Sequence, residues 1–208
     1  MEQARKECIL RSAVQAFTRF GFKKASIDEI AKDAGVAKGT VYLACENKED
    51  LFYQALHREV REWMAEASKM IDPRIPADEL MMQMAFASLD QINSKPMVKS
   101  LLSGECGDLL PGWKDRFSEL RGMCSSNVAE ILRLGIKQGR FRPDIDVEAV
   151  AQLLMDLQID TLLFHNADTP DRTERLERRA NAAFDLMLQG LVPRTAEKQP
   201  VRHSQPRA

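Results

Sequence analysis

The chain has 208 residues, of which 44% are hydrophobic and 29% are charged, and its formal net charge is −1. This length allows one or two domains, and the apolar fraction is sufficient for a buried core. The sequence has no run of 18 apolar residues and no apolar leader, so we expect neither a membrane span nor a secretory signal. The four cysteines lack CxxC spacing, which fits a reducing cytoplasm.

The charge is unevenly distributed along the chain. Residues 1–47 carry eight Lys or Arg against six Asp or Glu, and residues 194–208 carry four against one. The segment between them is therefore acidic. A basic head on an acidic body is consistent with one nucleic-acid-binding face and one regulatory part.

The stretch from residue 26 to residue 48 predicts two short helices joined by a tight turn. Ser26 precedes Glu29 by three residues at the start of an apolar stripe, which is a capping box. Gly35 follows that stripe, at a point where a helix that turns sharply needs a positive φ. A second helix is expected from about residue 37 or 38 to residue 44, with Asn47 as the N-cap of a third.

The second of these helices carries the residues that suit contact with DNA. Lys38 offers a charge, Gly39 allows close approach of its backbone, and Thr40 offers a hydroxyl group. Tyr42 and Leu43 follow one turn later, so phosphate contact and base-edge contact could be combined on one helix. A helical hairpin that binds nothing has the same spacing, so the spacing alone leaves both interpretations open.

Beyond residue 50 the periodicity predicts only helices. We expect them over residues 47–70, 77–93, 96–106, 113–138, 146–165 and 170–190, separated by Pro and Gly. The expected protein is therefore all-α. Residues 1–48 would form a helix-turn-helix domain, the helix from residue 47 would connect it to a helical domain over residues 49–192, and residues 193–208 would form a disordered basic tail.

Catalytic and metal-binding patterns are weak. The three histidines are far apart in the sequence, and Asp156 and Asp160 have the spacing of an ordinary polar helix face near His165. Neither a phosphate-binding glycine loop nor a nucleophile motif is present. We therefore expect no enzyme activity, no metal and no cofactor.

A series of motifs keeps a fixed order through residues 9–56. ILRSAVQAF is followed by GFKKASIDEIAKDAGVAKGTVY and then by NKEDLFYQAL. This segment resembles the DNA-binding domain of TetR-family transcriptional regulators, and several motifs in register are more specific than any one of them. The resemblance implies phosphate contacts from Ser26 and Lys48 and a recognition surface formed by Lys38, Gly39, Thr40, Tyr42 and Leu43.

Three positions depart from the family pattern. Ala44 cannot donate a hydrogen bond to a phosphate, and Cys45 is smaller than the Phe that usually packs behind the recognition helix. Ala37 replaces the more usual Ser at the helix cap, a loss of about 1 kcal/mol of local stability. We therefore expect a lower DNA affinity or an unusual DNA site.

The resemblance also implies a dimer interface in the last two helices and a ligand cavity among the central ones. Two apolar faces could pair across a two-fold axis, although both could equally be internal core. The candidate interface residues are Val150, Leu154, Leu157, Thr161, Leu176, Ala180, Ala183, Phe184 and Met187. The candidate cavity residues are Met84, Leu102, Cys106, Trp113, Phe117, Met123, Leu157 and Phe164.

These expectations describe a cytoplasmic homodimeric regulator, most simply a repressor that a small-molecule effector releases from a palindromic operator in double-stranded DNA. One alternative is a thiol-redox sensor with Cys45 as the switch and Cys8 or Cys106 as the resolving thiol. The other is a helical enzyme or scaffold with a vestigial DNA-binding head.

Overall fold

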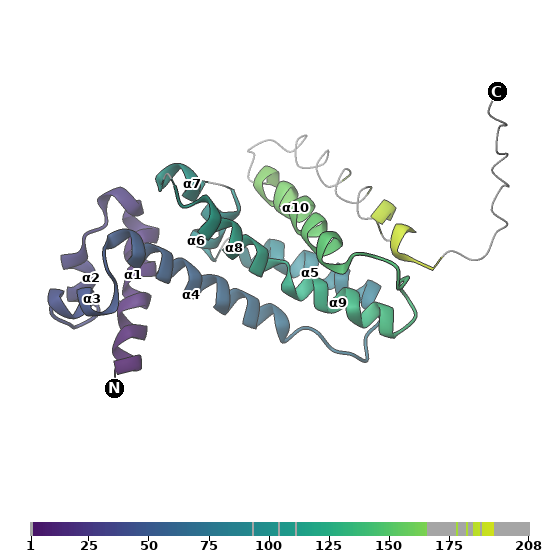
Figure 1. Cartoon of the computed structure of the whole chain (residues 1–208), viewed down its shortest axis with the longest axis horizontal. Coiled ribbons are helices and arrows are strands. Elements are labelled where there is room, and N and C mark those ends of the chain that lie inside the picture. Colours follow the sequence, from purple (N-terminus) through teal and green to yellow (C-terminus); the bar gives the residue numbers. More distant parts are fainter. Residues whose placement is uncertain are drawn as a thin grey trace, which may run out of the picture.

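The computed structural model describes residues 2–165 except 93, 104 and 111, together with residues 178, 182, 185–187 and 189–193. Every regular element in this part of the chain is an α-helix, which confirms the all-α class. Figure 1 shows a small helical head, a long helix that leaves it, and further helices gathered along that helix. Within the described residues, no helix is both long and apolar enough to cross a membrane.

The head consists of α1 (Glu2–Lys24), α2 (Ile27–Asp33) and α3 (Lys38–Ala44), packed on the first turns of α4 (Lys48–Ser68). An aromatic cluster joins α1 to α4. The ring of Phe52 lies 5.1 Å from that of Phe17 and 5.3 Å from that of Phe22, both in edge-to-face geometry. Such pairs add to the burial of apolar area, so the start of α4 is part of the core of the head.

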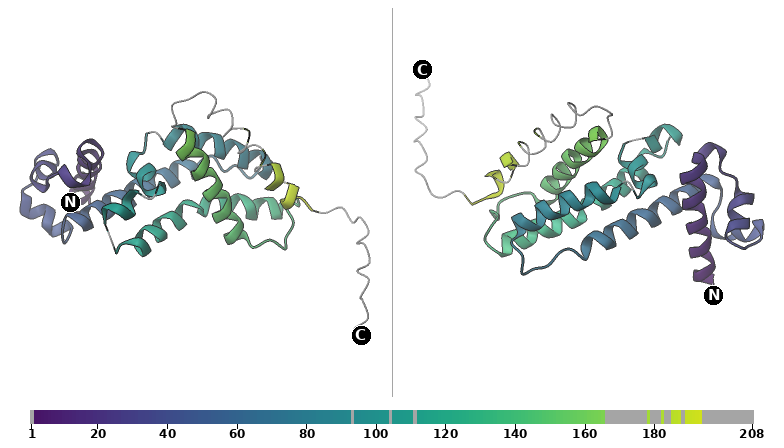
Figure 2. Two further views of the ribbon diagram at one scale, coloured as in Figure 1. Left: turned by 90° about the horizontal axis from the view of Figure 1, so that it is seen from above. Right: turned by 180° about the vertical axis from the view of Figure 1, so that it is seen from behind.

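Helix α4 connects the head to the rest of the protein. Asn47 caps it as predicted, because its Oδ1 accepts a hydrogen bond from the backbone N–H of Asp50 at 2.7 Å. Its buried residues follow helical spacing from Leu51 to Ala67, so one apolar stripe serves the head first and the body afterwards. Figure 2 shows this helix from two further directions, with the head at one end and the body along the remainder.

The body contains α5 (Ala77–Ile92), α6 (Pro96–Leu102), α7 (Glu105–Leu109), α8 (Lys114–Cys124), α9 (Ser126–Lys137) and α10 (Val147–His165). Helix α4 packs on α6 and α8, and α9 packs on α5 and α10. Asn127 ties α9 to α4, because its Nδ2 donates to the Met64 carbonyl at 3.0 Å. Gln138 holds the α4–α5 connection through the Ala77 N–H and the carbonyls of Pro73 and Ile75.

The single helix predicted over residues 113–138 is wrong, because the chain forms α8 and α9 with Ser125 between them. The Ser125 hydroxyl donates to the Gly122 carbonyl at 2.8 Å, and the Ser125 backbone N–H bonds to the same carbonyl at 3.3 Å. These local bonds compete with the regular i→i−4 ladder and interrupt the helix. Most of the helix predicted over 170–190 and the tail from residue 194 lie outside the described residues.

Candidate nucleic-acid interface

Helix α2 is closed by hydrogen bonds at both of its ends, and those at its C-terminal end form the turn that leads to α3. Ser26 caps α2, and its Oγ accepts from the Glu29 N–H at 3.1 Å. At the other end, the N–H of Val36 bonds to the Ala31 carbonyl and the N–H of Gly35 to the Lys32 carbonyl, which is a Schellman motif. Gly35 has φ 67, so the glycine predicted for this turn supplies its left-handed residue.

Helix α3 presents its outer face to solvent. Val41 is fully buried and anchors the helix on the head, whereas Lys38 and Gly39 are exposed. Tyr42 is 48% exposed and Leu43 is 89% exposed, an unusual position for a large apolar side chain. Thr40 is half-buried. One charge, one phenol and one apolar group therefore lie on a short helix that is free to enter a groove.

Lys38 already has an acidic partner within the head. Its Nζ lies 2.9 Å from Oδ2 of Asp28 on α2, and both side chains are exposed. The hydrogen bond to Asp28, followed by the charge of the same group, raises the pKa of Lys38. A phosphate contact by Lys38 requires that Asp28 be exchanged for the phosphate. The sequence does not predict this ion pair, because Asp28 and Lys38 are ten residues apart and lie on different helices.

The two expected phosphate-binding residues outside α3 are also engaged. The Ser26 hydroxyl donates a hydrogen bond to Oε2 of Glu29 at 3.1 Å, in addition to accepting one from the Glu29 N–H. The Nζ of Lys48 donates to the Lys23 carbonyl at 3.3 Å and lies 4.9 Å from the centre of the Phe22 ring. Both residues flank the α2–α3 unit, and Lys48 joins the end of α1 to the start of α4.

The three departures from the family pattern have structural consequences. Ala37 caps α3 without any side-chain hydrogen bond. The Ala44 carbonyl accepts a hydrogen bond from Nε2 of Gln54 at 3.2 Å, so α4 secures the end of α3. Cys45 is buried, and its thiol donates to the Val41 carbonyl at 3.3 Å.

The environment of Cys45 does not suit a redox switch. Burial raises the pKa of Cys45 to about 11, with a smaller contribution from Asp50. Reactive sensor thiols are accessible and have lowered pKa values, because the thiolate is the nucleophile. Among the described residues, no group of three His, Cys, Asp or Glu side chains could hold a metal ion.

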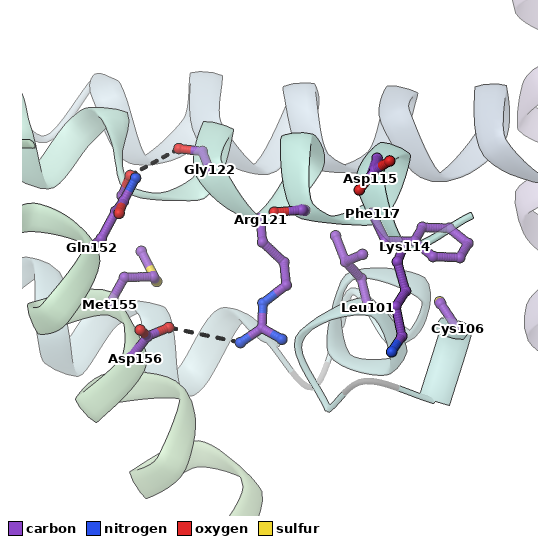
Figure 3. Close-up of a pocket in the computed structure, with 12 residues that line it drawn as sticks. Leu101, Cys106, Lys114, Asp115, Phe117, Arg121, Gly122, Gln152, Met155 and Asp156 are labelled. Atoms are coloured by element: carbon purple, nitrogen blue, oxygen red, sulfur yellow. Dashed lines mark hydrogen bonds and ion pairs between the residues drawn. The ribbon is translucent and has the colours of Figure 1, made fainter. Parts of the chain in front are cut away.

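A hollow of about 650 Å³ lies between α6, α8 and α10 (Figure 3). Cys106 and Phe117, two of the predicted cavity residues, line it. The other lining residues are Leu101, Lys114, Asp115, Ser118, Arg121, Gly122, Ser125, Gln152, Met155 and Asp156. Small-molecule sites span roughly 300–1,000 Å³, so the size fits a ligand.

The remaining predicted cavity residues lie elsewhere or outside the described part. Met84 and Leu102 are buried in the core, and Trp113 packs on Tyr53 and Phe117. Met123 lines a separate hollow beside α4, and Leu157 is half-buried. The side chain of Phe164 lies outside the described residues.

The predicted dimer face divides between core and surface. Leu154 is buried within the chain, Val150 and Met187 pack against its core, and Leu157 is half-buried. Leu153 of α10 is 54% exposed, and Leu186 is also exposed. Four of the predicted positions, Leu176, Ala180, Ala183 and Phe184, lie outside the described residues, as does the side chain of Thr161.

A buried carboxylate connects α4 to the wall of the hollow. Glu59 is only 4% exposed, and its Oε2 accepts from the Val98 N–H at 2.9 Å, in the first turn of α6. Burial raises the pKa of Glu59, opposed by backbone hydrogen bonds and by the charge of Lys95. Because α6 also carries Leu101, the helix that leaves the head is bonded directly to an element that lines the hollow.

An all-α chain whose head presents α3 beyond a Schellman turn belongs to the class of helix-turn-helix DNA-binding proteins. Residues 9–55 match the family described as bacterial regulatory proteins, tetR family. The HTH-type transcriptional regulator YhgD of Bacillus subtilis is 29% identical over 157 residues, which is 74% of this chain and 81% of the relative. The HTH-type transcriptional repressor KstR2 of Mycolicibacterium smegmatis is 23% identical over 197 residues, which is 94% of this chain and 94% of the relative.

A solved structure has a similar fold. It is the transcriptional regulator FadR from Bacillus subtilis in complex with stearoyl-CoA, with a TM-score of 0.67 and 20% identity over 89% of this chain and 98% of that chain. The chain therefore has the DNA-binding domain of the TetR family over residues 9–55, and over most of its length it is similar to transcriptional regulators.

Proposed function

We propose that this protein is a homodimeric repressor that binds a palindromic operator and is released by a small-molecule effector. The observation that carries the proposal is the outer face of α3, where Tyr42 and Leu43 are exposed next to Lys38. An apolar side chain left in solvent at that position suits a base edge, because Leu43 could contact a thymine methyl group.

DNA binding would use two copies of the head. In helix-turn-helix dimers the recognition helices enter successive major grooves about 34 Å apart, which is one helical turn. Lys38 would exchange Asp28 for a phosphate, and Ser26 and Lys48 would contact the flanking backbone. Gly39 and Thr40 would lie closest to the DNA at the start of α3, and Tyr42 would contribute stacking or its hydroxyl group.

The hollow between α6, α8 and α10 is the proposed effector site. The stearoyl-CoA complex of FadR, which has the same fold, supports a small molecule in a body of this kind. An effector can shift the head spacing only by its difference in affinity between the two conformations. The Glu59 bond between α4 and α6 offers a direct connection between the two sites.

Dimer formation would place α10 and the chain after it at the two-fold axis. The exposed Leu153 and Leu186 are apolar groups that such a contact could cover, because homodimer interfaces are more apolar than the rest of a protein surface. Sedimentation equilibrium of the full chain tests it, with Leu153→Lys expected to shift the protein towards monomer. A wild-type protein that is monomeric at micromolar concentration would contradict the proposal.

The DNA assignment is tested by sequence selection from random DNA, followed by gel-shift titration. Lys38→Ala should weaken binding of the selected operator and reduce the slope of log affinity against log salt by about one. Tyr42→Ala should weaken binding without changing the oligomeric state or the melting temperature. Lys69→Ala is the matched control, because this exposed lysine lies at the far end of α4. Retained operator affinity in both head variants would refute the assignment.

A further inference from the structure

Several polar residues that line the hollow lie on one face of α8. Lys114, Ser118 and Arg121 have i, i+4 and i+7 spacing on α8, which places them on one face over about 10 Å. Figure 3 shows Lys114 and Arg121 extending from α8 to the same side, and Asp115, the neighbour of Lys114 in the sequence, also lines the hollow. Two cations and a hydroxyl group therefore line one wall.

The rest of the lining divides into an apolar part and a polar part. The apolar part is Leu101, Cys106, Phe117 and Met155, and the polar part is Asp115, Ser125, Gln152 and Asp156. Leu101 lies between the two cationic side chains in Figure 3, the Phe117 ring lies beside Lys114, and Met155 approaches from α10. Phe117 and Leu101 are themselves buried, so packing holds their side chains in place on the apolar side of the hollow. A cationic wall beside an apolar part suits a ligand that is both anionic and apolar.

The acid that faces Arg121 is held weakly. The Arg121 guanidinium lies 3.7 Å from Oδ1 of Asp156 on α10, which is longer than a hydrogen bond, and Asp156 is exposed. Exposed ion pairs of this kind contribute little stability. A ligand anion with two oxygens can bind a guanidinium through two parallel charge-assisted hydrogen bonds, which is a stronger arrangement. Lys114 has no ion pair with any described residue and remains available for the same anion.

We propose that the hollow binds an anionic amphiphile, whose headgroup replaces Asp156 as the partner of Arg121. Lys114 provides a second cationic contact, and the apolar chain of the ligand lies over Phe117, Leu101 and Met155. Binding thus removes the ion pair between α8 and α10. This inference rests on the proposed role of the hollow as the effector site and specifies the chemical class of the effector.

Titration calorimetry of the full chain in the absence of DNA tests the ligand class. The probes are dodecanoate, the dodecanoyl thioester of coenzyme A, and the cation dodecylammonium, all below their micelle concentrations. We expect saturable binding of at least one of the two anionic probes and at least tenfold weaker binding of dodecylammonium. Binding of the free acid alone indicates a carboxylate ligand, and binding of the thioester alone indicates a ligand that carries phosphates. Failure of both anions to bind, or equal binding of the cation, would overturn the proposal.

Matched variants then test the residues. Arg121→Gln should lower the affinity for the anionic probe at least tenfold. Asp156→Asn should raise this affinity several-fold, because it removes the competing acid. Arg133→Gln is the control, because Arg133 also pairs with an acid of α10, Glu148, but does not line the hollow. Unchanged affinity in Arg121→Gln, or weaker binding in Asp156→Asn, would refute the proposal that the ligand headgroup replaces Asp156 as the partner of Arg121. Since no DNA is present, this result is independent of the operator experiments.

Discussion

Replacement of Glu59 tests how strongly α4 is joined to α6. In Glu59→Ala the N–H of Val98, which donates to Oε2 at 2.9 Å, loses its acceptor inside the protein. A buried donor without a partner costs about 1–3 kcal/mol. The removal of a buried charge offsets part of this cost. We therefore expect the free energy of unfolding to fall by about 1–2 kcal/mol.

Glu59→Gln separates the hydrogen bonds from the charge. The amide keeps one acceptor oxygen for the first turn of α6 and removes the buried carboxylate. The variant should therefore unfold within about 1 kcal/mol of the wild type at neutral pH. It also provides the reference for the pH dependence, because Gln does not titrate.

The sign of the pH effect follows from burial. The pKa of Glu59 is raised from its usual 4.5, so the folded protein binds this proton more tightly than the unfolded chain does. The contribution of Glu59 to stability is fully present below about pH 4.5 and is lost as the pH rises through the folded pKa. The unfolding free energy of the wild type minus that of Glu59→Gln should therefore decrease from pH 4 to pH 7. The nearby charges of Lys95 and Glu62 oppose each other in this shift.

Urea unfolding followed by circular dichroism measures these differences at one fixed protein concentration, because a dimer gains apparent stability with concentration. Ser68→Ala, at an exposed position on the same helix, serves as the control and should change the stability by less than about 0.5 kcal/mol. If Glu59→Ala is as stable as the wild type, or the pH trend has the opposite sign, the coupling argument fails.

Three further predictions concern the head and the body. Asp28→Asn should strengthen operator binding about two- to fivefold in gel shifts, because Lys38 no longer has a competing partner; weaker binding would show that the pair positions Lys38 instead. Gly135→Ala should lower the melting temperature, at a cost of about 1–3 kcal/mol, because the new methyl group would overlap the buried ring of Phe141; an unchanged melting curve would contradict this packing. Peroxide should leave operator binding unchanged, since the Cys45 thiol is buried with a pKa of about 11; a loss of binding that Cys45→Ser prevents would restore the redox hypothesis.

The head was predictable because its signals are local. The caps at Ser26 and Asn47 and the turn at Gly35 each depend on residues within a few positions, and the structure has all three. The partners of Lys38 and of the Ala44 carbonyl were not predictable, because each lies ten residues away. Their contacts exist only once α2 or α4 has packed beside α3.

The effector hollow was the least predictable part. The sequence predicts an apolar lining for it. A sequence pattern, however, cannot distinguish an apolar side chain in a cavity wall from one in the core, and Met84 and Leu102 are in the core. A better signal was available in the polar spacing of Lys114 and Arg121 around the apolar Phe117. The break between α8 and α9 occurs at Ser125, whose hydroxyl donates to the Gly122 carbonyl. The sequence alone does not show whether a serine within a helical pattern makes such a bond or faces solvent.

The length of α4 has a mechanical consequence. At 21 residues and about 1.5 Å per residue it is a rod of roughly 30 Å with the head at one end and Glu59 near its middle. If the body end tilts by about 5°, the far end moves by roughly 2–3 Å, and two symmetric copies would change the distance between their heads by up to about twice that. An adjustment no larger than the replacement of one side chain by a ligand could therefore put two heads out of register with the grooves of one operator. The helix acts as a lever whose gain is set by its length, so sensitivity to the effector should depend on its stiffness as much as on the affinity of the hollow.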